Sequence, residues 1–239
     1  MQKTNNINAK QRTAEGRDLD GDLSTAEAYY DTVLEITWMA NANYTGTPSN
    51  WDNATSSVAS LNPYGSGIQG WRLPATNQTN DNTSDDHVES YIGTRDTGYN
   101  ISAPGTLYSG STASEMAHMF YNTLGNKALC DPVLSTETTC SGPVPGYGLS
   151  STGAFLANSG NYWSNTIYTS RNDSRWALDF RFGNQGGLER QYSLYAWPVH
   201  DGGVGTPIFT ATMITCIGSD TGTFDAPLDV PLTVNKRAR

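Results

Sequence analysis

The first residues whose types and spacing suggest a specific chemistry are three aspartates near the start of the chain. Asp18, Asp20 and Asp22 alternate in the run RDLDGD, which also contains Gly21. Alternating carboxylates beside a glycine resemble the first half of a calcium loop, because Ca²⁺ prefers several oxygen ligands. The match is incomplete, since Gly21 precedes the third acid and Tyr29 stands at position 12, where a bidentate glutamate belongs. An acidic, solvated turn explains the run better, with calcium binding as the alternative.

A second chemical grouping is the cysteine pair Cys130 and Cys140, which encloses a short loop rich in Pro, Ser and Thr. A disulfide here would contribute about 3 kcal/mol in the chain-entropy model. We predict this disulfide in preference to two free thiols, and we expect Cys216 to be a small buried side chain. The sequence has no CxxC pair and no histidine cluster, so it predicts no zinc site.

Catalytic groupings are absent from the sequence. The three histidines, His87, His118 and His200, have no evident nucleophile partner, and there is no GxSxG motif. We therefore expect a protein that is not an enzyme. We expect His118 to be packed and hydrogen-bonded, because it lies near an apolar helical stripe.

The candidate ligand-binding residues are polar and aromatic side chains late in the chain, in the predicted loops or at the strand ends beside them. Aromatic rings stack on sugar faces or peptide groups, and polar side chains add directional hydrogen bonds. The alternative for each residue is an exposed loop position that binds nothing. The candidates are Tyr168, Arg171, Asn172, Asp173, Arg175, Asn184, Gln185, Glu189, Arg190 and Tyr192.

Three antiparallel strands must position these loops, at about 162–169, 175–183 and 191–199. In the second strand Trp176, Leu178, Phe180 and Phe182 fall on every second position, so they should face the core. The run Asn184-Gln185-Gly186-Gly187 then reads as the hairpin connection to the third strand.

Earlier segments predict the remaining elements of an α+β fold. Residues 27–38 indicate a hairpin that turns near Asp31. Residues 51–61 have helical spacing of apolar side chains, with a cap from Ser49 or Asn50. A second helix is expected from Thr112, where Thr112 and Glu115 have the spacing of a capping box.

We divide the chain into an N-terminal arm (1–16), a domain (17–203) and a β-rich extension (204–239). Within the domain, the segment 75–110 is a polar loop insertion without an apolar period. The extension contains the strand-like run 207–217, which we expect to join subunits into a homo-oligomer or polymer by strand addition. The alternative is an ordinary extra strand on the same sheet.

The composition limits the classes of partner. The net charge of −9 argues against a nucleic-acid binder, which needs a basic face. No apolar run has the roughly 20 residues of a membrane helix, so no membrane insertion is expected. The Asn, Ser, Thr, Gly and Tyr content suits a protein at the cell surface, outside the cell or on a virion. The chain begins without an apolar secretion signal, so we expect that a signal was removed or that another export route is used.

These features together resemble the Lcl C-terminal-domain family, named for the C-terminal domain of a bacterial collagen-like adhesin. The resemblance spans about 17–203, and its residues are Tyr30-Asp31 through Thr37-Trp38, the Trp51/Ala54 helix, Gly70-Trp71-Arg72-Leu73-Pro74, Ser114 through Phe120, Tyr162-Trp163-Ser164, Trp176 through Phe182, Tyr195-Ala196-Trp197 and Asp201-Gly202.

The resemblance implies a C-type-lectin-like fold, with two helices flanking a small twisted antiparallel sheet and long loops. It also implies attachment and the binding of sulfated polysaccharide. The chain departs from the family in having no Gly-X-Y stalk, in the 75–110 insertion and in the extension after 203. It also lacks the Glu-Pro-Asn, Gln-Pro-Asp and Trp-Asn-Asp triplets with which calcium-dependent lectins hold sugars.

Three functions remain open at this stage. The first is an extracellular recognition or adhesion module that binds a glycan or a surface polymer. The second is a self-assembling subunit of a surface fibre, sheath or virion. The third is a variable protein of a diversity-generating retroelement, a class that uses this fold with variable loop positions late in the chain.

Overall fold

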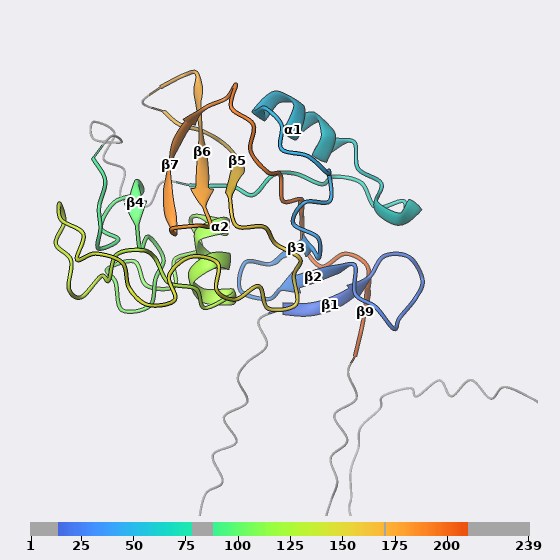
Figure 1. The fold of residues 1–239 in the computed structure, drawn as a ribbon. Coiled ribbons are helices and arrows are strands. Elements are labelled where there is room, and N and C mark those ends of the chain that lie inside the picture. Colours follow the sequence, from blue (N-terminus) through green and yellow to red (C-terminus); the bar gives the residue numbers. More distant parts are fainter. Residues whose placement is uncertain (1–13, 78–87, 170, 210–239) are drawn as a thin grey trace, which may run out of the picture. The chain divides into compact units, whose positions relative to one another are not determined.

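The computed structural model describes residues 14–77, 88–169 and 171–209 (Figure 1). The fold is mixed α+β, as predicted, with two short α-helices and two antiparallel sheets in this part of the chain. We expected a single small sheet, so the second sheet is a correction. None of the helices described is long and apolar enough to cross a lipid bilayer.

The first sheet joins both ends of the described chain, in the strand order β8-β3-β2-β1-β9. The predicted hairpin is confirmed: β2 pairs with β3, and the Asp31 carboxylate accepts hydrogen bonds from Val33 N and Leu34 N in the turn. Glu35 completes this turn with a φ of 56°. The strands are β1 (Ala14–Asp18), β2 (Ala28–Asp31), β3 (Ile36–Met39), β8 (Val199–Asp201) and β9 (Thr206–Pro207).

This sheet extends past both of the domain limits that we predicted. β1 begins at Ala14, inside the expected 1–16 arm, and β9 pairs with it from within the expected 204–239 extension. Ile208 N continues the pairing by donating to Gly16 O at 2.9 Å. The limits 17 and 203 are therefore too narrow. Most of the arm, most of the strand-like run 207–217 and Cys216 lie outside the described residues.

The second sheet has the strand order β4-β7-β6-β5. β5 and β6 confirm two predicted strands, but the predicted strand at 191–199 is wrong. The chain turns earlier, at 180–183, where Gly183 adopts a φ of 70°. The run Asn184-Gln185-Gly186-Gly187 is therefore part of a strand and not a hairpin connection. The strands are β4 (Gly98–Tyr99), β5 (Asn161–Ile167), β6 (Ser174–Asp179) and β7 (Asn184–Glu189).

Two helices lie against the second sheet (Figure 1). α1 (Trp51–Ala59) lies beside β5 and begins as predicted, since the Asn50 side chain accepts from Asn53 N at 2.9 Å. A 3₁₀ turn, η1 (Pro63–Gly65), follows it. α2 (Glu115–His118) continues into the π-helical turn η2 (Met119–Thr123).

The predicted capping box of the second helix is wrong. The N-cap is Ser114 and not Thr112, because the Ser114 hydroxyl accepts from Ala117 N at 3.2 Å. Glu115 does not reach back to its own helix. Its carboxylate forms two hydrogen bonds of 2.8 Å with Arg72, which also contacts Asp201 at 2.6 Å. Arg72 thereby links the GWRLP turn to α2 and β8.

The core is dominated by aromatic rings. Trp176, Leu178 and Phe180 of the alternating run are completely buried, as predicted, whereas Phe182 is half-buried. Phe180 packs edge-on against Tyr162 with ring centroids 4.9 Å apart. Burial of a side chain such as Leu178 or Phe180 contributes about 1.5–3 kcal/mol. This core fixes β5 and β6 relative to the helices and makes the second sheet a rigid support.

The segment 75–110 is more than a surface insertion. β4 forms one edge of the second sheet and pairs with β7 through Gly98 and Tyr99. Ile101 is 2% exposed and belongs to the main core. Residues 78–87, including His87, lie outside the described part. The rest of the segment is integrated into the body of the protein.

Candidate ligand-binding groove

A groove of about 420 Å³ lies along β5, β6 and β7 of the second sheet, and we call it the face groove. Residues from these three strands and from three flanking segments meet there. Its lining consists of Glu89, Thr97, Asn161, Tyr168, Arg171, Ala177, Asp179, Arg181, Asn184, Gly186, Gly187 and Leu188.

The floor of the face groove is flat because its central residues are small. Ala177 on β6 is paired with Gly186 on β7, and directly opposed residues of an antiparallel pair point to the same face. A Cβ atom at Gly186 would find no atom nearer than 3.8 Å. The space beside Gly186 is therefore open, and any larger side chain at Gly186 would fill part of it.

The neighbouring glycine has the opposite role. A Cβ atom at Gly187 would lie 2.5 Å from two ring atoms of Tyr168. That ring is 3% exposed and packs edge-on against Trp176, with centroids 4.7 Å apart. Gly187 is paired with Trp176, so the Tyr168 ring lies on the Trp176 face of the sheet, and Gly187 is the residue that leaves room for it.

Charged groups of both signs line the face groove. Arg181 forms a bidentate pair with Asp179, with an Nη2–Oδ2 distance of 2.6 Å. That contact raises the pKa of Arg181, chiefly through the hydrogen bond. Arg171 makes no salt bridge within residues 14–77, 88–169 and 171–209, so its guanidinium is available to a ligand.

A tyrosine pair borders the groove beside Asn184. Tyr99 is paired with Asn184 across the β4–β7 ladder and stacks on Tyr91 with ring centroids 5.4 Å apart. Burial, followed by the nearby Glu89 carboxylate, raises the pKa of Tyr99 above its usual value of 10.0. Its phenol is therefore protonated at neutral pH and can donate or accept a hydrogen bond.

A second, smaller pocket of about 380 Å³ lies where β7 meets the start of α1. Asp173, Glu189 and Arg190 line it, together with Asn50, Asp52 and Gln191. Arg190 and Asp52 approach to 3.6 Å, and both are more than half exposed. Such an exposed pair contributes about 0–1 kcal/mol, so it does not close the pocket firmly.

The structure divides the predicted binding residues into four groups. Tyr168, Arg171 and Asn184 line the face groove, and the smaller pocket takes Asp173, Glu189 and Arg190. Asn172 and Tyr192 are exposed but line neither hollow. The last two predicted residues, Arg175 and Gln185, are buried within the fold.

Those two buried residues make contacts within the fold, and the placement of Gln185 in a loop is wrong. Gln185 is 1% exposed, accepts from the Ser114 hydroxyl at 2.5 Å and donates to Asp96 O at 2.9 Å. Arg175 is 7% exposed and lies 4.3 Å from the ring centroid of Trp51. Both positions lie in strands, where one side chain in two faces a covered surface.

Sequence reasoning missed most of the groove floor, although one signal for it was present. The alternation that turns Trp176 and Leu178 inward places Ala177 and Asp179 on the opposite face of β6. The contribution of Glu89 and Thr97 had no comparable signal, because their segment has no apolar period.

The acidic turn differs in composition from the prediction. Oxygen atoms of Asp18, Asp20 and Glu27 lie within 4.8 Å of one another, whereas Asp22 accepts a hydrogen bond from Ser24 N. Asp18 accepts from two backbone N–H groups, and Glu27 accepts from Leu19 N at 3.0 Å. These bonds shape the turn by themselves, and calcium binding here stays a prediction.

The predicted disulfide is present between Cys130 and Cys140, whose Cα atoms are 5.2 Å apart. His118 is 4% exposed and its Nδ1 lies 3.2 Å from Ser111 O, as expected for a packed, hydrogen-bonded histidine. His200 bridges two carbonyl oxygens, of Asp201 and Gln69.

A comparison with family models matches residues 27–200 to the Lcl C-terminal domain. The chain belongs to this family. A search of curated proteins found no significant match. The Lcl C-terminal domain match includes the β2–β3 hairpin, both α-helices and the entire second sheet with its face groove. The match confirms the resemblance noted in the sequence, and it indicates a domain related to surface adhesion.

Proposed function

We propose that this Lcl C-terminal domain is a non-enzymatic recognition module with a C-type-lectin-like fold. It acts outside the cell, at a cell or virion surface, and its face groove binds a glycan or a surface polymer. The observation that carries this proposal is the face groove itself. Polar side chains from separate segments meet there over a flat floor of small residues.

The chemistry of the lining supports binding rather than catalysis. Asp179, Arg181 and Asn184 offer donors and acceptors in fixed positions, because they sit on or beside paired strands. Hydroxyl-rich ligands are recognised through such directional bonds. The lining residues include no histidine or cysteine. Among the lining hydroxyl groups, that of Thr97 lies 3.5 Å from that of Tyr168.

Gly186 provides a direct test of the face groove. Gly186→Thr fills the open floor with a residue that suits strands, while Ile167→Thr places the same residue at a half-exposed site outside the groove. We expect binding to glycans or isolated surface polymers to fall about tenfold or more for Gly186→Thr only. The measurement is a glycan array, followed by titration of the ligand it identifies.

Two results would count against this function. One is the absence of binding to any glycan or surface polymer by the intact chain. The other is a ligand whose affinity is the same for wild type, Gly186→Thr and Arg171→Ala, because that ligand would not occupy the face groove.

A second candidate function is a structural subunit of a fibre, sheath or virion that assembles through 204–239. The placement of β9 favours it, because β9 forms one edge of the first sheet and leads into the remaining chain. Sheet edges accept further strands. Deletion of 210–239 should then reduce the size of assemblies measured by light scattering, and an unchanged size would exclude this route.

A further inference from the structure

The disulfide loop exposes two adjacent apolar side chains. Val133 and Leu134 are 85% and 73% exposed, although burial of such side chains is favourable. They lie between Cys130 and Cys140, in the loop that the disulfide closes.

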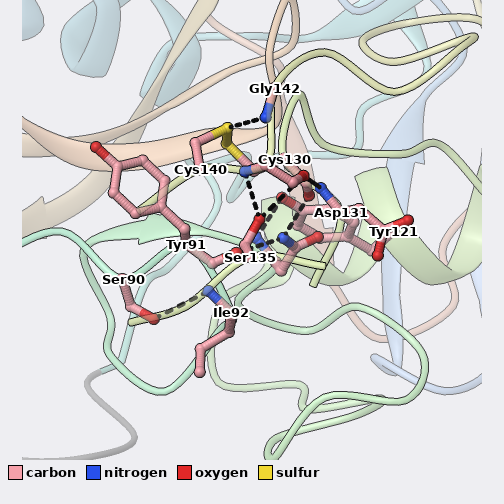
Figure 2. The surroundings of a disulfide bond; sticks show 11 residues. Ser90, Tyr91, Ile92, Tyr121, Cys130, Asp131, Ser135, Cys140 and Gly142 are labelled. Atoms are coloured by element: carbon pink, nitrogen blue, oxygen red, sulfur yellow. Dashed lines mark hydrogen bonds between the residues drawn. A yellow bond between two sulfur atoms is a disulfide. The ribbon is translucent and has the colours of Figure 1, made fainter. Parts of the chain in front are cut away.

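Hydrogen bonds hold the backbone of this loop around the disulfide, and Figure 2 shows Asp131 and Ser135 beside the Cys130–Cys140 bond. Asp131 Oδ1 accepts from Val133 N at 2.8 Å and from Leu134 N at 3.3 Å. Ser135 N donates to Asp131 O, and Ser141 N donates to the Ser135 hydroxyl. A preorganised apolar element loses little conformational entropy when it is buried against a partner.

The body of the protein also anchors the loop at both ends. Asn100 Nδ2 donates to Cys130 O at 2.9 Å. Glu137 accepts from Arg95 Nε at 2.9 Å, and Tyr91 N donates to Glu137 O. The exposure of Val133 and Leu134 is thus imposed by contacts on either side of them.

A groove of about 720 Å³ lies directly beside this loop, and we call it the apolar groove. Leu134 itself lines it, so the projecting side chains and the hollow belong to one continuous surface. Its other apolar lining residues include Pro104, Pro132, Pro143, Val144 and Pro145.

The buried polar side chains in the apolar groove already have partners, whereas Lys127 is exposed. Tyr121 donates to Gly183 O and accepts from Asn100 N, and the Asn126 side chain bonds to Ser150 and Ser151. A site for a small polar ligand needs a few convergent polar groups. This groove instead offers shape and apolar surface, which suits a side chain from another protein surface.

The charges of the lining identify the fitting partner. Lys127 is the only lysine among the described residues, it makes no salt bridge with them, and Asp131 lines the same groove. A chain of net charge −9 repels its own copies over most faces. The surface around the apolar groove carries the projecting Val133 and Leu134, the groove itself, and the opposite charges of Lys127 and Asp131.

We propose that this surface is an isologous interface between two copies of the chain. Leu134 and Val133 of one copy enter the apolar groove of the other, and Lys127 of each copy faces Asp131 of the other. A two-fold axis requires a self-complementary patch, and this surface provides both halves of each contact. The proposal is independent of the ligand of the face groove and of the 204–239 extension.

The test is the concentration dependence of the mass of the intact, oxidised chain, measured by sedimentation and light scattering. Leu134→Asp places a charge in the interface, and Leu156→Asp is the matched control, since Leu156 is 70% exposed and does not line the groove. We expect the dissociation constant of the dimer to rise about tenfold or more for Leu134→Asp only.

A charge test separates the two grooves. Lys127→Glu should weaken the dimer by about tenfold, while Arg171→Glu makes the same charge change without effect on the dimer. A wild-type chain that is monomeric at every concentration would overturn the proposal. So would an assembly that Leu134→Asp and Lys127→Glu leave unchanged, because its contacts would lie elsewhere.

Discussion

The face groove and the apolar groove are built on different principles within one chain. The face groove rests on paired strands, and its rim carries charged and amide groups. The apolar groove is formed mostly by loops, and its buried polar side chains, such as Tyr121 and Asn126, are hydrogen-bonded within the protein. A cation without a salt bridge among the described residues lines each of them, Arg171 in the first and Lys127 in the second.

This difference shows how one small domain can separate two kinds of recognition. Directional polar groups on a rigid sheet select a ligand by its pattern of hydrogen-bonding groups. An apolar hollow beside a projecting side chain selects a surface by its shape. Variants of the protein can test whether ligand binding at the face groove and self-association at the apolar groove are independent of each other.

The largest expected effect comes from removing the disulfide. Cys130→Ser with Cys140→Ser should lower the free energy of unfolding by about 3 kcal/mol, since the short loop is no longer closed in the unfolded chain. Urea unfolding of the oxidised wild type and the double variant measures this loss. We expect ligand binding at the face groove to survive in the folded variant, while self-association falls. Loss of both ligand binding and self-association would show that the two grooves are not independent.

The next effect separates two adjacent glycines of β7. Gly187→Ala should destabilise the protein by about 1–3 kcal/mol, because the new methyl group overlaps the Tyr168 ring. Gly186→Ala has open space and should be neutral or stabilising by about 0.4–1 kcal/mol. Thermal or urea unfolding of both variants checks the contrast. Equal destabilisation would show that the floor of the face groove is less open than described.

High pH should destabilise the fold through two buried tyrosines. Burial raises the pKa of Tyr162 to about 12, and burial also raises the pKa of Tyr121, which lines the apolar groove. Above pH 10 the unfolded chain loses these phenolic protons while the folded chain retains them. Each tyrosine then removes about 1.4 kcal/mol of stability per pH unit. This stability is fully present below pH 10.

Urea unfolding at a series of alkaline pH values measures this slope. In the variant Tyr162→Phe, the loss of stability per pH unit should be smaller by the contribution of one tyrosine, up to about pH 12. A slope that is the same in wild type and in Tyr162→Phe would show that Tyr162 titrates at the same pH in the folded and unfolded chains.

The smallest expected effect concerns calcium. Asp18, Asp20 and Glu27 are brought together on the first sheet, whereas both grooves involve other elements. We expect addition of a chelator to leave ligand binding and self-association unchanged, because backbone N–H groups already satisfy Asp18 and Glu27. Parallel titrations with calcium and with chelator measure this. A calcium requirement at either groove would link regions that we regard as separate.

The sequence predicted the elements that rest on strong local patterns. The alternation from Trp176 to Phe180, the Asn50 cap and the cysteine spacing each led to a feature that the structure contains. Such patterns depend on neighbouring residues, so they are readable without the fold. The general family was readable for the same reason.

The errors arose where a distant contact decided the outcome. Two glycines after Asn184 and Gln185 looked like a turn, but every residue from Asn184 to Glu189 is paired with β6, so the segment is extended. Glu115 had the spacing of a capping box, but Arg72 competes for its carboxylate from 43 residues away. Local spacing carries no information about either partner.

The order of the strands also has a consequence for how the chain folds. β5, β6 and β7 follow one another in the sequence and pair as neighbours. β8 instead pairs with β3, which lies far earlier in the chain: Thr37 and Gly202, which are hydrogen-bonded in this region, are 165 residues apart. Long-range pairing is slow because loop closure must come first. We therefore expect the second sheet to gain amide protection before the first in pulse-labelled hydrogen exchange. The first sheet closes last, when β8 and β9 arrive, so the growing chain cannot complete its fold until synthesis has passed Pro207.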